Sequence, residues 1–270
     1  MPKIRLVSSD LNGTLVHQHT MSDMIKLYGK ISDYEVANEA FNKQTNGQLS
    51  MQEAFAIAGP LTKGISLRQG IEYTRTHMQY VEGFKQFVDA LHKARIPLVI
   101  NSTGYSVTIY AIREQVGREK IHGHIGNSLK FGENGDIQSV LTEEELENLV
   151  VGYFTNGNSE AYDRIRSIGE VALGIVDEQA KADLIVGYAA KNLPQVSPNE
   201  IAHIGNSMGD SGGIIGIAGL GGMGIAFNFN YDLEMFLKQK LSSEKVSGEI
   251  AFITPKGEAP NLGDLLPLLI

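Results

Sequence analysis

Short runs of apolar and β-branched residues alternate with longer amphipathic stretches along the chain. The first run, Ile4 to Ser9, stops at an aspartate and is typical of a strand that is buried on both faces. Comparable runs lie at 96–100, 121–125, 200–204, 223–227 and 249–254. Because helical patterns separate most of these runs, the sequence predicts an α/β fold in which helices cover both faces of a parallel sheet.

Helical spacing fills most of the segments between those runs. Phe84, Phe87, Val88 and Leu91 mark one face of a stretch with the period of an amphipathic helix. Further helices are predicted at 106–117, 142–168, 181–191 and 232–241, with a short one at the end of the sequence.

One segment departs from this alternation. Residues 129–131 and 137–140 both suit strands, and Glu133-Asn134-Gly135 lies between them. Because Asn-Gly favours the tight turns of hairpins, we predict an antiparallel hairpin here.

The segment between the first two predicted strands has a helical pattern throughout. The pattern runs from residue 22 to residue 79, with breaks at 46–47 and 59–60. Ser50 is followed three residues later by Glu53, which is the signature of a capping box at the start of a helix.

This helical segment predicts a second domain. We place a small helical cap at residues 16–80, inserted between strands one and two of a core domain made of residues 1–15 and 81–270. A cap at this point would cover the carboxyl ends of the strands, where open parallel sheets bind their ligands.

Polar clusters follow three of the predicted strands. They are Ser-Asp-Leu-Asn-Gly-Thr at 9–14, Asn-Ser-Thr-Gly at 101–104 and Gly-Asn-Ser-Met-Gly-Asp at 205–210. Because the carboxyl ends of parallel strands meet at one edge of a sheet, we expect these clusters to form a single site.

Composition and charge narrow the possible functions. Of the 270 residues, 42% are hydrophobic and 20% are charged, which indicates a folded globular protein. The absence of cysteine excludes disulfides, thiolate metal sites and cysteine nucleophiles. The net charge of −8 disfavours a nucleic-acid surface, and no apolar run is long enough to span a membrane. The first residues lack the pattern of a signal peptide, so we expect a cytoplasmic protein.

The polar clusters carry candidate catalytic groups. Asp10 directly follows a buried strand and suits a carboxylate nucleophile, although an aspartate there also suits a helix cap or a turn. Ser102, with the backbone amides beside it, suits an oxyanion at the start of a helix. Lys181 suits the neutralisation of a phosphate, although most lysines are simply solvated. Asp210 lies on a glycine-rich loop and suits Mg²⁺, which prefers oxygen ligands.

Other patterns in the sequence are weaker indications of a catalytic or binding function. Residues 219–224 match the spacing GxGxxG, but they precede a strand, whereas a dinucleotide-binding turn follows one, so we predict a turn. His122 and His124 alternate on a predicted strand without a third ligand nearby, and we expect them to pack. His17 and His19 follow the first polar cluster and suit either a substrate contact or a hinge of the cap.

Four segments, in order along nearly the whole chain, match the motifs of one enzyme family. The matching segments are 4–15 (IRLVSSDLNGTL), 81–83 with 101–106 (NSTGYS), 179–182 (QAKA), and 204–210 with 218–219 and 224–227. They resemble the four motifs of the haloacid dehalogenase (HAD) superfamily, most closely those of its phosphoserine phosphatase branch. The resemblance implies a three-layer Rossmann-like core with a parallel sheet and a small helical cap.

The resemblance also implies roles for individual residues. The implied catalytic residues are Asp10 as the phosphorylated nucleophile, Asn12, Ser102 and Lys181. The implied phosphate- and substrate-binding residues are Leu11, Asn12, Ser102, Thr103, Gly104, Lys181 and His19. The implied ligands of Mg²⁺ are Asp10, Asn12 through its backbone carbonyl, Asn206 and Asp210.

Three features depart from the pattern of the family. Asn12 stands where the phosphatases have the aspartate that acts as general acid and base, and an amide cannot exchange a proton near neutral pH. Asn206 stands where an aspartate binds Mg²⁺ directly, so the ion should bind more weakly. The positions that bind the phosphoserine head group fall at His19, Ala56 and Ala58, without the arginine that would pair with a carboxylate.

We therefore expect a Mg²⁺-dependent phosphohydrolase that acts on a small phosphorylated metabolite, with phosphoserine a poor candidate. Asp10 would attack phosphorus in line and form an aspartyl-phosphate intermediate. The alternative is a catalytically impaired relative that binds a phosphorylated ligand or a partner without turnover, because two catalytic carboxylates have become amides.

Overall fold

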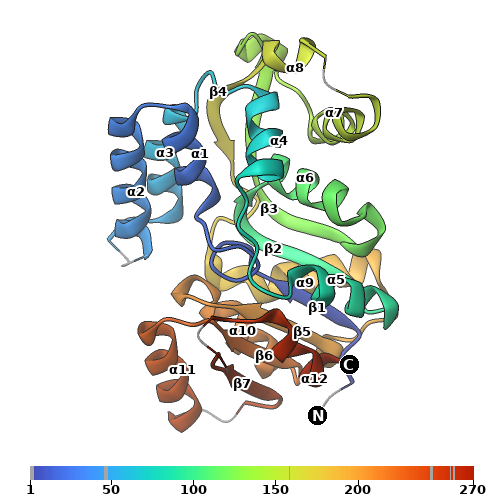
Figure 1. Cartoon of the computed structure of the whole chain (residues 1–270). Helices are drawn as coiled ribbons and strands as arrows, with labels where there is room; N and C mark the ends of the chain where they lie inside the picture. The colour runs from blue at the N-terminus through green and yellow to red at the C-terminus, as the bar shows by residue number, and fades with distance from the viewer. Residues whose placement is uncertain (1–2, 46–47, 158, 244–245, 256, 258) are drawn as a thin grey trace.

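A seven-stranded, mostly parallel sheet forms the centre of the molecule (Figure 1). The computed structural model describes residues 3–45, 48–157, 159–243, 246–255, 257 and 259–270. The strands in this part of the chain are β1 Leu6–Ser9, β2 Leu98–Tyr105, β3 Gly123–Glu133, β4 Ile165–Ala172, β5 Ile201–Gly205, β6 Met223–Phe227 and β7 Glu249–Ile253. Their order across the sheet is β4-β3-β2-β1-β5-β6-β7, and β4 is antiparallel to its neighbour β3.

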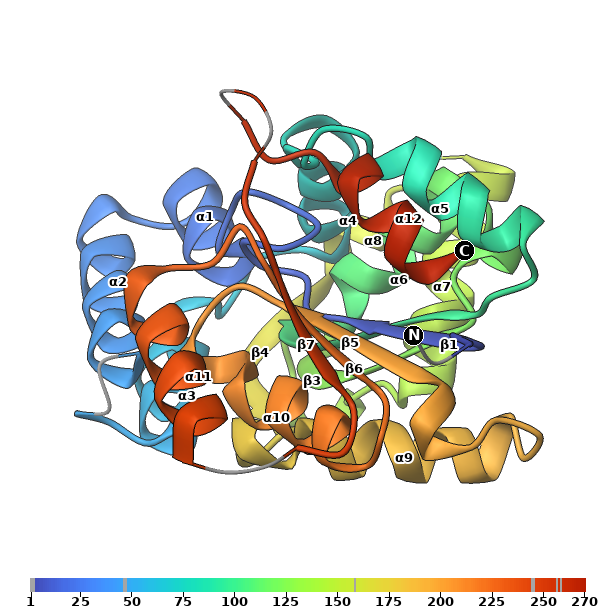
Figure 2. The same ribbon diagram turned by 90° about the horizontal axis from the view of Figure 1, so that it is seen from below.

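Helices cover both faces of the sheet, as the sequence predicts (Figure 2). The α-helices are α1 Thr20–Tyr28, α2 Ile31–Thr45, α3 Met51–Leu61, α4 Leu67–Thr76, α5 Phe84–Lys93, α6 Ser106–Val116, α7 Glu143–Asn156, α8 Ala161–Arg164, α9 Lys181–Asn192, α10 Ser211–Gly219, α11 Tyr231–Ser243 and α12 Leu266–Leu269. Short 3₁₀ turns include η2 Ile137–Ser139, η3 Glu178–Ala180, η5 Met208–Asp210 and η6 Leu262–Leu265. The predicted α/β fold with a Rossmann-like parallel sheet is confirmed.

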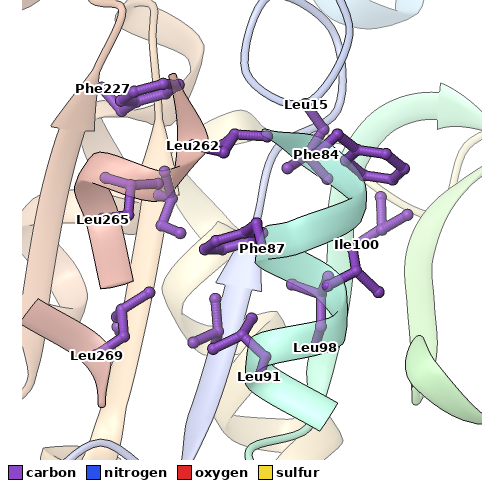
Figure 3. Packing of buried hydrophobic residues seen from close by; sticks show 14 of the residues in the cluster. Leu15, Phe84, Phe87, Leu91, Leu98, Ile100, Phe227, Leu262, Leu265 and Leu269 are labelled. Atoms are coloured by element: carbon purple, nitrogen blue, oxygen red, sulfur yellow. The ribbon is translucent and has the colours of Figure 1, made fainter. Parts of the chain in front are cut away.

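The central strand β1 shows why both faces must be covered. Leu6 packs in a hydrophobic cluster with α9 and α10, whereas its neighbour Val7 packs in another with α5, η6 and α12. Successive side chains of a strand point to opposite faces, so an apolar β1 needs helices on both sides. Figure 3 shows the second cluster, in which the α5 residues Phe84, Phe87 and Leu91 lie near Leu262, Leu265 and Leu269. Burial of one such phenylalanine contributes roughly 1.5–3 kcal/mol.

The register of the parallel strands places the three polar clusters at one edge. Ser9 at the end of β1 pairs with Ile100 of β2 and with Ile204 of β5, so the polar clusters that follow these three residues begin at the same level. The amide of Asp10 then donates to the carbonyl of Ile204, at 2.9 Å. The first residue after β1 is therefore held beside the end of β5.

The predicted hairpin at 129–140 is wrong in its second strand. The chain does turn at Asn134 and Gly135, both of which have positive φ. Residues 137–139 then form the turn η2, and an isolated bridge joins Gly132 to Val140. The antiparallel partner of β3 is β4, which lies more than thirty residues further along the chain and pairs with it from residue 128 to residue 133.

The predicted helix at 142–168 is correct only in its first part. Helix α7 ends at Asn156, and the short helix α8 spans residues 161–164. Residues 165–168 belong to β4 instead, because the exposed backbone of β3 offers them a ladder of hydrogen bonds. Long-range pairing of this kind overrides the local helical pattern.

The predicted helical segment between β1 and β2 consists of α1 to α4. The capping box of Ser50 and Glu53 is confirmed at the start of α3. The predicted break at 46–47 lies outside the described residues, and α3 continues through Pro60 to end at Leu61.

These helices share their hydrophobic core with part of the sheet. Phe41 and Ile71 of the segment belong to the same buried cluster as Tyr110 of α6, Leu129 of β3 and Val150 of α7. The segment therefore packs on the β3–β4 end of the molecule, beside the carboxyl edge of the parallel strands (Figure 1). Its division from the core at residues 16 and 80 stays a prediction.

Candidate active site

A buried lysine joins two carboxylates at the carboxyl edge of the sheet. Lys181 Nζ donates to Asp10 Oδ1 at 3.1 Å and to Asp210 Oδ1 at 2.6 Å. Asp10 follows β1, Lys181 begins α9, and Asp210 ends the turn η5 that follows β5. All three side chains are almost fully buried. Three separate loops thus bring together residues that are up to 200 positions apart in the sequence.

The charges of these three groups depend on one another. Burial lowers the pKa of Lys181, but Asp10 and Asp210 raise it by more, so the ammonium stays protonated. Burial raises the pKa of Asp10 to about 7, although the charge of Lys181 opposes this rise. Burial also raises the pKa of Asp210, but Lys181 and His203 lower it by more, so its pKa lies below the usual value. Asp210 is therefore the permanent anion of the group.

Asp210 is held from two sides. Its Oδ1 accepts from Lys181, and its Oδ2 accepts from the backbone amides of Asn206 at 2.9 Å and Ser207 at 3.2 Å. Both oxygens are thus engaged within the protein, so the carboxylate positions the loop after β5 and the ammonium of Lys181. Its predicted role as a ligand of Mg²⁺ stays a prediction.

The side chain of Asn12 connects the first polar cluster to the helical segment. Its Oδ1 accepts from the backbone amide of Thr20, the first residue of α1, at 3.2 Å. Its Nδ2 lies on the side of Gly104, 3.8 Å from where a Cβ atom on that glycine would stand. The amide nitrogen, a hydrogen-bond donor, is therefore the part of Asn12 that faces the second polar cluster.

Asn206 packs over the turn that follows Asp10. Thr14 Oγ1 donates to Asn206 Oδ1 at 3.1 Å. Gly13 has a φ of +78°, and a Cβ atom there would lie 2.3 Å from Asn206 Nδ2. A glycine is thus required at residue 13 both by the backbone conformation and by the neighbouring amide.

The second polar cluster lines the other side of Asp10. Ser102 is buried, and its hydrogen bond with the Asp10 carboxylate lowers the pKa of Asp10. Ser102 Oγ also accepts from the amide of Gly104 at 3.1 Å, within the part of β2 where its pairing with β3 shifts register. Thr103 is half-buried beside it, and Leu11 is buried in the core next to Asp10. The structure therefore brings the predicted cradle residues together around Asp10.

The predicted head-group positions are more scattered. His19 is exposed just before α1, where its ring packs 4.3 Å from the ring of Phe41 and its Nδ1 lies 3.2 Å from Ser22 Oγ. Ala56 is exposed on α3, whereas Ala58 is buried inside the helical segment. Ala58 is thus part of the hydrophobic packing of α3, and the aromatic ring of Phe41 is the group beside His19.

A buried polar network that the sequence analysis did not single out lies behind the site. His203 Nδ1 lies 2.9 Å from Ser8 Oγ, and Asn101 Nδ2 donates to Ser8 Oγ and to the carbonyl of Lys181. The other ring nitrogen of His203 lies 3.9 Å from Asp210 Oδ1. Burial lowers the pKa of His203 to about 4, so the imidazole is neutral and holds the loops in place without adding charge. The sequence signal that could have identified His203 was a histidine within a run predicted to be a fully buried strand.

The remaining sequence patterns have structural roles. Residues 219–224 form the turn from α10 into β6, as predicted. His122 Nδ1 lies 2.9 Å from the hydroxyl of Tyr188, and the ring of His124 packs edge-on against Tyr110. Among the described residues, no helix combines the length and apolarity that a membrane crossing requires.

The oxygen donors predicted for Mg²⁺ come from the loops after β1 and β5, which the bond between Thr14 and Asn206 ties together. They are the Asp10 carboxylate, the Asn12 carbonyl and the Asn206 amide oxygen, with the Asp210 carboxylate in a supporting place, and all are ligand types that Mg²⁺ prefers. The described part of the chain contains no cluster of three or more His, Asp or Glu residues that could hold a metal. With so few protein ligands, a Mg²⁺ ion held by these oxygens would keep several waters and bind a substrate phosphate as well.

Comparisons with known proteins show similarity in sequence and in fold. No protein-family model matches the chain. A phosphoserine phosphatase of Archaeoglobus fulgidus is 24% identical over 244 residues, which are 90% of this chain. The chain spans 58% of the length of that relative. Among solved structures, a phospho-aspartyl intermediate analogue of phosphoserine phosphatase matches with a TM-score of 0.66 at 16% identity, covering 99% of this chain and 100% of that one.

This chain has the fold of a HAD phosphoserine phosphatase. A substrate-bound phosphoserine phosphatase complex matches it over 100% of both chains, with a TM-score of 0.67 and 15% identity. A HAD family hydrolase of Salmonella enterica serovar Typhi matches over 92% of this chain and 68% of that one, with a TM-score of 0.62 and 13% identity. The predicted resemblance to the phosphoserine phosphatase branch of the HAD superfamily is confirmed.

Proposed function

We propose that this protein is a Mg²⁺-dependent phosphohydrolase that acts on a small phosphorylated metabolite through an aspartyl-phosphate on Asp10. The observation that carries the proposal is the placement of Lys181 between Asp10 and Asp210, at 3.1 and 2.6 Å. A permanently charged ammonium beside the nucleophile would hold a phosphoryl oxygen while Asp10 attacks. The similarity to phosphoserine phosphatases in sequence and fold supports this assignment.

In this proposal the chain's own residues position the phosphoryl group. Asp10 attacks phosphorus, the P–O bond to the leaving group breaks, and the phosphoryl group is transferred to the carboxylate. Ser102, Lys181 and the backbone amides at Leu11, Thr103 and neighbouring residues hold its equatorial oxygens. Such transfer depends mainly on positioning and electrostatic stabilisation, which a rigid, buried cradle supplies.

Mg²⁺ would be held by Asp10, the Asn12 carbonyl and Asn206. When bound, the ion supplies positive charge that compensates the phosphate and the Asp10 carboxylate. One protein carboxylate in this set predicts weaker binding than the two that relatives offer, so we expect activity to require Mg²⁺ at higher concentration.

Asn12 determines which leaving groups the site can expel. The amide has no proton to give, but its Nδ2 faces the second polar cluster and can donate a hydrogen bond to an oxygen there. A leaving group of low pKa departs as an anion and needs only such a hydrogen bond. Alcohols of high pKa need a proton, and their release should be slow.

A second candidate function rests on the two amides. Asn12 and Asn206 replace the general acid and one metal ligand, while the cradle of Asp10, Ser102 and Lys181 is complete. A protein that binds a phosphorylated ligand without turnover would keep the cradle and lose those two groups.

Release of inorganic phosphate from p-nitrophenyl phosphate, with and without Mg²⁺, distinguishes the two functions. The phosphohydrolase proposal expects Mg²⁺-dependent release that Asp10→Asn abolishes. No release at saturating Mg²⁺, together with retained binding of inorganic phosphate, would favour the binding function. A screen of phosphorylated metabolites under the same conditions would then identify the substrate.

A further inference from the structure

A cavity of about 900 Å³ lies beside the two loops that hold Asp210 and Lys181. Its walls include Gln44 from α2, Glu178 from η3, Met208 and Gly209 from η5, and Met235 and Phe236 from α11. Glu178 precedes Lys181 by three residues, and Gly209 directly precedes Asp210. The charges of Lys181 and Asp210 act on Glu178, so this wall of the cavity lies near the proposed phosphate site. Gln44 comes from the helical segment, and the other residues of the wall come from the sheet part of the chain.

The carboxylate of Glu178 has a fixed place in this wall. A Cβ atom on Gly209 would lie 2.6 Å from both of its oxygens, so a larger residue there would displace the carboxylate from this position. Gln44 Nε2 donates to Glu178 Oε2 at 3.2 Å. The hydrogen bond from Gln44 therefore orients the carboxylate beside the backbone of Gly209, at the border of the cavity.

Burial raises the pKa of Glu178, and the charge of Lys181 opposes this rise without cancelling it, so the neighbouring charges do not fully compensate the carboxylate. Lys181 is the nearby cation, and it already donates to Asp10 and Asp210. The hydrogen-bond donor to Glu178, Gln44, is neutral. Lys238, which also lines the cavity, is paired with Glu234 at 2.6 Å. Three carboxylates around one ammonium leave a negative potential on the cavity side of the site.

The rest of the wall suits a short carbon chain. Met208 and Phe236 are half-buried and offer apolar surface, and methionine adapts readily to different ligands. A carboxylate on the ligand would be repelled by Glu178, and the positions His19, Ala56 and Ala58 contain no arginine that would pair with it.

From these contacts we infer that the cavity binds the alcohol part of the substrate, and that Glu178 selects phosphomonoesters whose alcohol carries an ammonium group. This inference rests on the proposed function, because it assigns the substrate class of the same site. The phosphate would bind at Lys181, and the ammonium would reach the carboxylate of Glu178. Glu178 is then a specificity-determining residue.

Three phosphomonoesters of similar size test the inference: phosphoethanolamine, which carries an ammonium; propyl phosphate, which is neutral; and phosphoglycolate, which carries a carboxylate. We expect kcat/KM to be about 10- to 100-fold higher for phosphoethanolamine than for propyl phosphate, the usual value of a hydrogen bond between charged groups. Phosphoglycolate should be the poorest of the three. Equal values for the first two, or a preference for phosphoglycolate, would overturn the inference.

Variants of Glu178 test whether this side chain causes the preference for phosphoethanolamine over propyl phosphate. Glu178→Gln should reduce the ratio of the first two kcat/KM values towards one, and Glu178→Asp should restore part of it. Asp183→Asn removes the same charge from an exposed position on α9 outside the cavity, and it should keep the wild-type ratio. An equal fall in Asp183→Asn would show a general effect of charge and would also overturn the inference.

The same ligands separate this inference from the proposed function. If wild type does not hydrolyse p-nitrophenyl phosphate, the phosphohydrolase proposal fails, and calorimetric titration with phosphoethanolamine and propyl phosphate takes the place of kinetics. Tighter binding of phosphoethanolamine that depends on Glu178 would still support the cation site. Equal binding of both ligands by wild type would exclude it.

Discussion

Lys181 lies closer to Asp210 than to Asp10, at 2.6 Å against 3.1 Å. The shorter bond goes to the carboxylate whose pKa lies below its usual value, and the longer one to the carboxylate that is proposed to react. Asp210 thus holds the ammonium of the lysine through the shorter hydrogen bond, while both carboxylates stabilise its charge.

Replacement of Lys181 by methionine tests this arrangement. Lys181→Met leaves two buried carboxylates without their cation, and we expect a loss of about 3–5 kcal/mol in the free energy of unfolding. Urea denaturation measures it. Lys191→Met, at the exposed end of the same helix, is the control and should change stability little. A similar stability for the two variants would contradict the assigned role of Lys181.

Asn12→Asp should raise turnover on substrates with poor leaving groups. An aspartate can keep the bond from the Thr20 amide, and it adds a proton donor. The expected gain is about 10²–10⁴-fold for alkyl phosphates and little for p-nitrophenyl phosphate, whose leaving group needs no proton. Steady-state kinetics with both classes of substrate measures it.

The double variant Asn12→Asp/Asn206→Asp completes that comparison. It should keep the gain of the single variant and reach it at lower Mg²⁺ concentration, because a second carboxylate joins the ligands. Equal gains for good and poor leaving groups would rule out the proton-transfer argument. Inactivity of every variant in excess Mg²⁺ would favour the binding function.

A phosphorylated form of wild type should accumulate during turnover. Transfer to Asp10 needs no acid when the leaving group is good, but hydrolysis of the aspartyl-phosphate requires a base to activate water, and Asn12 cannot serve. After addition of p-nitrophenyl phosphate and an acid quench, intact-mass spectrometry should show a species heavier by one phosphoryl group. The Asn12→Asp variant should accumulate less of this phosphorylated species, and the Asp10→Asn variant should form none. An unmodified wild type during active turnover would show that another group activates the water.

Two glycines with positive φ allow the effect of backbone strain to be measured separately from the effect of a steric clash with a neighbouring side chain. Gly64 has a φ of +89° and open space around it, whereas Gly13 has a φ of +78° and faces Asn206. Gly64→Ala should cost about 1–2 kcal/mol of stability and leave turnover unchanged. Gly13→Ala should cost more and reduce turnover at least about tenfold, since the displaced Asn206 is a proposed ligand. Thermal unfolding and kinetics measure both, and equal turnover of the two variants would remove Asn206 from the site.

The sequence predicts the parallel part of the sheet well because its strands are continuous apolar runs that end in recognisable polar clusters. Strand β4 could not be predicted in the same way. Its Ile165 and Ile168 have the spacing of a helix face, and the partner that makes them a strand, β3, is distant in the sequence. Local patterns do not carry the information about such pairing.

For the site, the order of the residues along four segments was enough to predict that Asp10, Ser102 and Lys181 lie close together. Glu178 was not identified because an acidic residue before a helix is common, and its place depends on the close approach of Gly209 from another loop. His203 offered a signal in its buried strand, but its partner Ser8 lies on a different strand. Contacts between loops and between strands decide these roles, and only the folded chain shows them.

The loop between α3 and α4 is joined to the sheet by backbone bonds. The amide of Gly64 donates to the carbonyl of Ser167 at 2.9 Å, and the amide of Ser167 donates to the carbonyl of Ile65 at 2.8 Å. On this side the helical segment cannot swing away as a rigid lid without breaking edge pairing of β4. Opening would have to pivot about this loop, with the widest movement at α2, where Gln44 meets Glu178. We therefore expect substrate to enter and product to leave on the α2 side, so that the carboxylate proposed to select the substrate also stands at its entrance.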